Sequence, residues 1–153
     1  MMPIIDHIHI TVADIRRAEE FYDELLPLFG FDLSLKERDS IPEYEYQIVE
    51  YHHEKLSIGI VSQRKEYANE IVSRRKAGAL HHLAFHAVSK DEVDELFGRL
   101  KAIPAVSVRP PQYYPEYCKD YYALFFKDTE GIEYEVVNFA RGSYFSNTKE
   151  NFK

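Results

Sequence analysis

The sequence predicts an α+β fold made of two copies of one unit, each with the order strand, helix and three strands. The chain has 153 residues, of which 45% are apolar, and this is enough for one domain with a well-filled core. A shift of 75 positions brings His7 onto His82 without a gap. Each of these histidines is followed by the same succession of an alternating strand and an amphipathic helix. The internal repeat alone therefore predicts an architecture of two similar units.

Each unit begins with an alternating strand, at residues 5–12 and 80–87. In a strand, successive side chains point to opposite faces, so residues two apart share a face. Most of the apolar residues gather on one face of each strand. The opposite faces carry the histidines, with His7, His9 and Thr11 in the first strand and His82, Ala84 and His86 in the second.

An amphipathic helix follows each of these strands. Asp14 and Ser89 are the predicted N-caps, and Ser89 with Glu92 has the spacing of a capping box. Apolar residues then recur at i, i+3, i+4 and i+7 in both copies. The first helix is expected to end at Pro27 and the second near Pro104, because proline lacks the N–H that a helix interior needs.

Three further strands complete each unit. Their predicted ranges are residues 31–35, 44–49 and 56–61 in the first half, and 105–109, 122–127 and 132–138 in the second. The turn from Asp128 to Gly131 predicts a hairpin between the last two strands, since glycine tolerates a positive φ.

The predicted organisation is a single domain over residues 1–153. The first unit covers residues 4–62 and the second covers residues 80–139. Between them, the charged segment 63–79 predicts a linker helix around residues 66–72, and the last part of the chain, 140–153, reads as a polar tail.

Composition excludes several classes of function. The chain has 19 Lys and Arg against 26 Asp and Glu, a net charge of -7, so no electrostatic footprint for nucleic acid is expected. No apolar run approaches the roughly 20 residues that cross a membrane, and the N-terminus reads directly into a strand, so we expect a soluble, cytoplasmic protein. The single cysteine, Cys118, excludes an internal disulfide and a thiolate site. A bound metal would need histidine and carboxylate ligands.

The sequence resembles the vicinal oxygen chelate superfamily, which includes glyoxalase I, extradiol dioxygenases, fosfomycin thiol transferases and bleomycin-binding proteins. The resemblance covers about residues 4–139. Its motifs are Asp-His-Ile-His-Ile-Thr-Val-Ala-Asp with Ala-Glu-Glu-Phe-Tyr, then His-His-Leu-Ala-Phe, then Tyr-Tyr-Ala-Leu-Phe-Phe-Lys-Asp-Thr-Glu-Gly-Ile-Glu-Tyr-Glu-Val. It implies that the two units form an open, cupped mixed sheet, a half-barrel, with helices on the outer face.

The resemblance also implies a ligand set for one divalent metal ion, namely His7, His82 and Glu135. Two imidazoles and one carboxylate can hold Zn, Ni, Mn, Fe or Co and leave coordination positions open. A substrate with two adjacent oxygens could then chelate the ion, which would stabilise an enolate or oxyanion. We therefore expect a metal-dependent, glyoxalase-like enzyme of lyase or isomerase type. Glu133 shares a strand face with Glu135, so a register error would exchange their roles.

Alternatives to this reaction remain open. The shift of 75 positions places Ile60 where the second half has Glu135, so the first half supplies no carboxylate, which disfavours a glutathione-linked methylglyoxal isomerase. An extradiol-type dioxygenase, a thiol transferase, and a metal-free drug-binding protein are the other candidates. The candidate catalytic groups are His9, His86 and Glu133.

A tyrosine-rich stretch at residues 112–122 predicts a loop over the mouth of a small-molecule pocket, lined by Tyr113, Tyr114, Tyr117 and Tyr122 together with Thr11. An edge or dimer-contact loop is the alternative. Related proteins commonly form homodimers, and in one such arrangement His7 and Glu135 come from one subunit and His82 from the other.

The remaining histidines are assigned structural or solvated positions. The pair His52 and His53 is expected in a solvated turn, because Glu50 and Glu54 flank it. His81 is expected to face away from His82 and to be structural.

Overall fold

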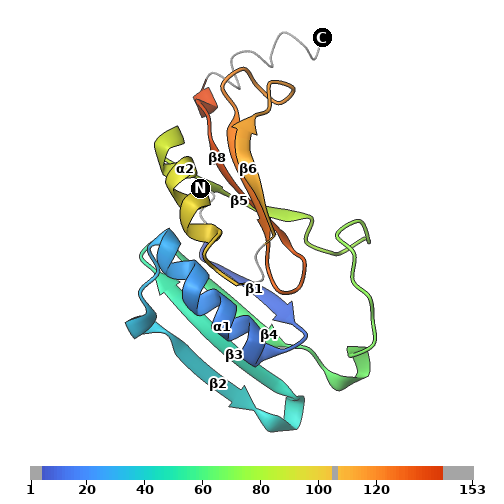
Figure 1. Ribbon diagram of the computed structural model, residues 1–153. Coiled ribbons are helices and arrows are strands. Elements are labelled where there is room, and N and C mark those ends of the chain that lie inside the picture. The colour runs from blue at the N-terminus through green and yellow to red at the C-terminus, as the bar shows by residue number, and fades with distance from the viewer. Residues whose placement is uncertain (1–4, 105–106, 143–153) are drawn as a thin grey trace. The chain divides into compact units, whose positions relative to one another are not determined.

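The computed structural model describes residues 5–104 and 107–142, and it divides the chain into two units, residues 1–76 and 77–153. Each unit has one α-helix and one four-stranded mixed sheet (Figure 1). The α+β class with two repeated modules is thus confirmed. Within the described residues, no helix is long and apolar enough to span a membrane.

Unit 1 contains the sheet with strand order β1-β4-β3-β2. Strand β1 runs parallel to β4, and the other neighbours are antiparallel. One face of the sheet is covered by α1 (Figure 1). The elements are β1 (His7–Val12), α1 (Ile15–Leu25), β2 (Glu37–Ile41), β3 (Tyr46–His53) and β4 (Leu56–Ser62).

Helix α1 begins where the sequence predicts and ends two residues before the predicted position. The Asp14 carboxylate accepts hydrogen bonds from the backbone N–H groups of Arg16 and Arg17, at 3.0 and 3.2 Å, and so caps the first turn. The helix ends at Leu25, two residues before Pro27, and a 3₁₀ turn, η1 (Leu26–Phe29), continues it. The residues that it buries have the predicted spacing, and they are Ala18, Phe21, Tyr22 and Leu25.

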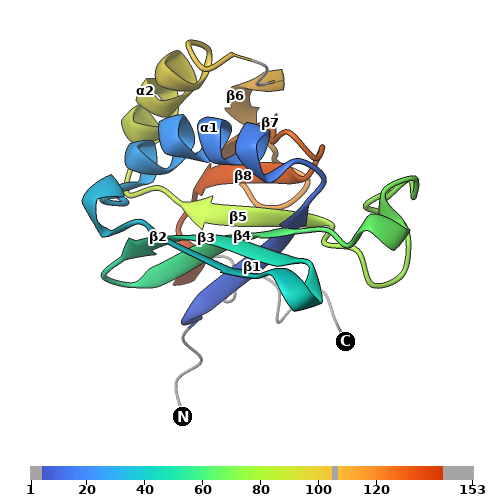
Figure 2. The same cartoon turned by 90° about the horizontal axis from the view of Figure 1, so that it is seen from below.

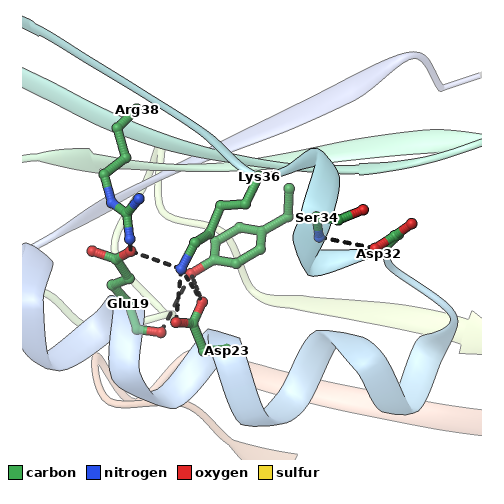
Figure 3. Close-up of polar contacts among 7 residues, drawn as sticks. Glu19, Asp23, Asp32, Ser34, Lys36 and Arg38 are labelled. Atoms are coloured by element: carbon green, nitrogen blue, oxygen red, sulfur yellow. Dashed lines mark hydrogen bonds and ion pairs between the residues drawn. The ribbon is translucent and has the colours of Figure 1, made fainter.

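A charged network ties α1 to the start of β2 (Figure 3). The Lys36 ammonium lies 2.9 Å from a Glu19 oxygen and 2.7 Å from Asp23, while Arg38 pairs with Glu19. From β3, the Tyr51 hydroxyl donates to Asp23 at 2.9 Å. These charge-assisted bonds fix β2 and β3 relative to α1.

Unit 2 repeats this arrangement, with strand order β5-β8-β7-β6 and the β5–β8 pair parallel. Helix α2 starts after Ser89, whose hydroxyl accepts from the Glu92 N–H at 3.1 Å. The Glu92 carboxylate accepts a hydrogen bond from the Val88 N–H at 2.6 Å, whereas a capping box would use the N–H of Ser89, one residue later. The elements are β5 (His82–His86), α2 (Lys90–Leu100), β6 (Ser107–Tyr113), β7 (Tyr122–Lys127) and β8 (Glu133–Asn138).

Two predicted elements are wrong. Residues 31–35 do not form a strand, because the Asp32 side chain accepts from the Ser34 N–H at 2.9 Å and caps a 3₁₀ turn, η2 (Leu33–Leu35). The linker helix does not form either, and residues 63–76 hold only the 3₁₀ turn η4 (Lys65–Tyr67). Ile71 and Val72 are 83% and 77% exposed, so a helix there would lack the tertiary packing that stabilises short helices. This segment extends beyond the end of β4 (Figures 1 and 2).

The remaining predicted strands match, β7 at both ends and the others with shifted ends. Residues 105 and 106, where the sequence predicts the start of the sixth strand, lie outside the described residues, as does the polar tail from residue 143 onward. Strand β6 continues past the predicted end through Pro110 and Pro111, where its pairing with β7 shifts register. Proline is tolerated there because β6 is an edge strand. The Asp128–Gly131 turn joins β7 and β8 as predicted, with φ of 78° at Gly131.

Candidate functional site

The face of the unit 2 sheet that turns away from α2 carries the histidine and glutamate side chains of β5 and β8. His82 and His86 on β5 share this face with Glu133 and Glu135 on the neighbouring strand β8. Both glutamates are buried, with 8% and 3% of their surface exposed. A buried carboxylate is tolerated only when its oxygens have partners, so their contacts define the site.

Glu135 has a different partner on each carboxylate oxygen. Its Oε2 lies 3.6 Å from His82 Nε2. Its Oε1 accepts a hydrogen bond of 2.6 Å from the Tyr121 hydroxyl. Burial, together with this hydrogen bond, raises the pKa of Tyr121 above its ordinary value, so the phenol stays protonated and remains a donor.

The geometry of His82 and Glu135 fits a shared metal ion. Two donors bound to one ion through bonds of about 2.1 Å lie roughly 3.0–3.5 Å apart, close to the observed 3.6 Å. His82 Nδ1 lies 2.7 Å from His81 Nδ1, so the two rings share a hydrogen bond that fixes the orientation of His82. The prediction that His81 faces away from His82 is therefore wrong. The pairing of the two rings leaves Nε2 facing Glu135. The His82 side chain is partly exposed, which leaves a path from solvent.

Glu133 has a different environment from Glu135, although the two share a face. Its Oε2 accepts from Arg109 Nη2 at 3.0 Å, and the guanidinium lies 4.5 Å from the centre of the Phe125 ring. Glu133 is thus held in an ion pair with Arg109, whereas Glu135 faces the imidazole of His82. The contacts therefore favour Glu135 over Glu133 as the metal-facing carboxylate.

An aromatic cluster covers the same face of unit 2. Tyr114, Tyr121 and Phe139 pack against three buried residues of the sheet, which are Ala123, Phe125 and Val137. Tyr117 joins them, with its ring centre 5.9 Å from Tyr114 and 5.2 Å from Tyr121. Two of the four predicted pocket tyrosines thus lie beside the Glu135 face.

The other two tyrosines lie on the opposite face of the sheet. Tyr122 donates to Asp94 of α2 at 2.7 Å, and this bond raises its pKa to about 12. Lys90, also of α2, donates to the Tyr113 hydroxyl at 2.6 Å. The prediction that Tyr113 and Tyr122 line the same face as Tyr114 and Tyr117 is therefore corrected. The period of two along β7 explains it, because residues 121, 123 and 125 share one face and Tyr122 points to the other.

His86 lies on the site face but is engaged by the backbone. Its Nε2 lies 3.2 Å from the Phe139 carbonyl oxygen, and since a carbonyl only accepts, Nε2 carries the proton. This contact leaves Nδ1 as the nitrogen that could accept a proton from a substrate.

In unit 1, the face of the sheet away from α1 carries the corresponding histidines. His7 Nδ1 lies 2.8 Å from Asp6 Oδ1, a carboxylate contact that resembles the orienting partner of a metal-bound imidazole. His9 Nε2 lies 3.2 Å from Glu50 Oε1 on β3. Thr11 follows on the same face and is exposed.

Gly59 on β4 allows the His9 side chain to reach Glu50. A Cβ atom at Gly59 would lie 2.7 Å from His9 Cδ2 and 3.0 Å from its Nε2, so the ring crosses directly over this glycine. The pairing of β1 with β4 also corrects the repeat. His7 pairs with Ser57 as His82 pairs with Glu133, so Gly59 is the counterpart of Glu135. Ile60, which the uniform shift matches to Glu135, is fully buried on the opposite face.

A second group of possible metal ligands lies in unit 1. Single ligand atoms of Glu37, Glu50 and His52 lie within 4.8 Å of one another. His52 is on β3, and its Nδ1 contacts Ser57 Oγ at 2.8 Å while its buried Nε2 lies 3.8 Å from Glu37. The prediction of a solvated turn at His52 is thus wrong, because β3 extends to His53.

The structure brings His82 and Glu135 together on neighbouring strands of one unit. Within one chain, these two residues therefore meet without a second subunit. His7 belongs to unit 1, where its side chain contacts Asp6. Tyr121 and Glu50 were missed as functional candidates, although the period of two would have placed Tyr121 with Phe125 and Glu50 with His52.

Comparison with known proteins gives one family and a set of similar folds. The model of the Glyoxalase/Bleomycin resistance protein/Dioxygenase superfamily matches residues 4–136. A search of curated protein sequences finds no match.

Three solved structures illustrate the likeness. A candidate glyoxalase from Bacillus halodurans is 26% identical with a TM-score of 0.65, covering 88% of this chain and 95% of that one. A glyoxylase/bleomycin resistance protein/dioxygenase domain from Frankia sp. EAN1pec is 20% identical with a TM-score of 0.70, covering 92% and 100%. The fosfomycin resistance protein FosX from Listeria monocytogenes, complexed with Mn(II) and a sulfate ion, is 18% identical with a TM-score of 0.64, covering 95% and 99%.

Proposed function

The chain belongs to the Glyoxalase/Bleomycin resistance protein/Dioxygenase superfamily, and from this membership we propose that it is a metal-dependent enzyme acting on a small molecule with two neighbouring oxygens. The observation that carries the proposal is the pair formed by His82 and Glu135, whose facing atoms are 3.6 Å apart. The ligands in the proposal are His7, His82 and Glu135, and the ion is one divalent metal among Zn, Ni, Mn, Fe and Co.

The metal would act as a Lewis acid toward the substrate oxygens. The residues of the chain supply the remaining requirements. Glu135 is buried, so its negative charge is poorly screened and attracts a cation strongly. The aromatic cluster beside it, with Tyr114 and Tyr121, offers an apolar wall for the carbon part of the substrate.

Proton transfer would fall to His9 or His86 rather than to Glu133. Glu133 forms an ion pair with Arg109. In His9 and His86, by contrast, Nε2 makes a hydrogen bond within the protein, and Nδ1 could accept a proton from the substrate. A lyase or isomerase reaction needs such a proton acceptor beside the metal. An extradiol dioxygenase or a thiol transferase would use the same ligands with a different second substrate.

Two further points support the proposal. A FosX protein of similar fold binds Mn(II), so this fold can hold a divalent ion. The donor set here, imidazole and carboxylate, suits the same class of ions. We also propose that the protein acts as a homodimer in the cytoplasm, as expected from the sequence, and that each subunit keeps its own His82 and Glu135 together.

A metal-free drug-binding protein is the second candidate, and the aromatic cluster with Tyr114, Tyr117 and Tyr121 favours it. Aromatic faces can sequester an apolar ligand without any metal. The two candidates differ in the role of Glu135, which a drug-binding protein would not need.

Metal analysis of the purified, untagged protein separates these candidates. We expect about one equivalent of metal in the native protein and loss of it in H82A and E135Q. The matched controls are H52A and E37Q, which alter the unit 1 group and should keep the metal. A native protein without metal would support the drug-binding candidate. Loss of metal in H52A alone would show that the ion binds to the group in unit 1 instead.

The reaction is tested by screening the metal-loaded protein. Glutathione hemithioacetals, catechols with oxygen, and fosfomycin with thiols represent the three reaction types. Turnover of one class that disappears in E135Q would assign the reaction, and turnover that persists in E135Q would contradict a role for Glu135.

A further inference from the structure

We propose that Tyr121 is a positioning residue for Glu135, which holds one carboxylate oxygen so that the other faces His82 and the metal. The inference rests on the proposed function. It concerns a residue that lies just before β7 and contacts Glu135 through its phenol hydroxyl.

The contacts of the Glu135 carboxylate carry this proposal. Oε1 accepts the 2.6 Å bond from Tyr121, and Oε2 lies toward His82. Because Glu135 is almost fully buried, water cannot easily replace either partner. The hydrogen bond therefore leaves Oε2 as the oxygen that would be free to hold a metal.

The Tyr121 ring is itself held in place. It stacks on Phe139 with ring centres 5.0 Å apart and meets Tyr117 and Tyr114 edge-on. Both of its backbone polar groups are bonded, since its carbonyl accepts from the Tyr114 N–H at 2.8 Å and its N–H donates to the Cys118 carbonyl at 3.1 Å. A donor fixed in this way can orient a ligand without reorganisation.

The neighbouring residue provides a matched control. Tyr122 also donates a phenol hydroxyl to a carboxylate, that of Asp94, at 2.7 Å. This bond lies on the α2 side of the sheet, away from Glu135. The variants Y121F and Y122F therefore each remove one hydroxyl and one carboxylate bond, and only the first touches the site.

The test is the metal affinity of both variants, measured by competition with a chromophoric chelator using Zn(II) and Co(II). We expect Y121F to bind roughly 10–100-fold more weakly than the native protein, which is the usual effect of losing an outer partner of a metal ligand. The visible spectrum of the Co(II) protein should also change, because Glu135 could then bind through both oxygens. Y122F should bind within about twofold of the native protein, since its partner is not a ligand.

Two results would overturn the inference, and they are distinguishable. If Y121F binds as tightly as the native protein with the same Co(II) spectrum, while H82A and E135Q lose the metal, Tyr121 does not position Glu135 and the proposed function stands. If the native protein itself binds no metal, both proposals fail. Circular dichroism of metal-free Y121F and Y122F checks that each is folded.

Discussion

At the scale of single residues, Gly59 is required by the position of His9. A methyl group at Gly59 would lie 2.7 Å from His9 Cδ2, so the ring would have to leave the position in which it contacts Glu50. We predict that Gly59→Ala lowers the free energy of unfolding by about 1 kcal/mol through the lost His9–Glu50 contact. Urea denaturation measures the change, and NMR of the His9 ring protons reports its displacement.

Gly98 provides the control for this substitution. It lies on an exposed position of α2, where an added methyl group would meet no atom within 4 Å beyond its chain neighbours and the backbone of its own helix. Gly98→Ala should therefore stabilise the protein by about 0.5–1 kcal/mol, because alanine is the better helix former. Equal effects of the two substitutions would contradict the role of Gly59.

Sequence reasoning predicted the histidines of the proposed site but not the residues that contact them. His7 and His82 stand out because each lies on a strand face with a second imidazole and the repeat aligns them. Tyr121 was hidden among neighbouring tyrosines, and only the face assignment of β7 separates it from Tyr122. The role of Gly59 was not predicted, because a uniform shift of 75 positions matches Ile60 to Glu135. Strand pairing, which decides the equivalent residues, matches Gly59 instead.

At the scale of elements, Lys36 joins β2 to α1. Its side chain is only 11% exposed and lies between Glu19 and Asp23. Lys36→Met would remove the positive charge that pairs with these two partly buried carboxylates. We predict that it lowers the free energy of unfolding by about 1–3 kcal/mol. Lys65→Met is the control, because Lys65 is 92% exposed and its ion pair with Glu45 spans 3.4 Å at the surface. Urea denaturation should show a change within about 0.5 kcal/mol for that control.

The same network predicts how stability depends on pH. Burial of Glu19 would raise its pKa from the ordinary 4.5, but the bonds to Lys36 and Arg38 outweigh this and lower it. The stability that the Glu19 carboxylate contributes to the folded chain is therefore fully present above about pH 4.5. It is lost as the pH falls through the lower pKa of the folded state. Glu19→Gln should be less stable than the native protein at pH 7, and the difference should shrink in acid.

Urea denaturation at about pH 7, 5 and 3.5 measures this difference. Glu54→Gln is the control, since Glu54 is exposed and its ion pair with Lys55 spans 3.7 Å at the surface, where such pairs contribute little to stability. A constant difference between Glu19→Gln and the native protein across this range would show that the carboxylate charge is not what holds β2 to α1.

Elements with strong local signals were predicted well, and those decided by packing were not. Helices α1 and α2 have both a cap and an apolar stripe, so cap and period agree. The segments at 31–35 and 66–72 have apolar residues but no such agreement. The Asp32 cap overrides the strand pattern in the first, and exposure of Ile71 and Val72 leaves the second without support.

At the scale of the whole molecule, the proposed metal would raise the stability of the folded chain, because the unfolded chain does not hold its ligands together. A ligand that binds only the folded chain adds about 2.7 kcal/mol at a free concentration of 100 times its Kd. For a chain of this size, that corresponds to a rise in Tm of roughly 5–10 °C. We predict that a chelator lowers the Tm of the native protein by about this amount.

The same chelator should leave the Tm of H7A and of H82A unchanged, because neither variant would hold the metal. His53→Ala is the control, since His53 ends β3 and contacts Phe31 rather than a proposed ligand, and it should keep the full shift. A chelator shift that persists in H7A but vanishes in H82A would restrict the metal to unit 2. In that case His82 and Glu135, with Tyr121 behind them, would form the protein part of the site without any donor from unit 1.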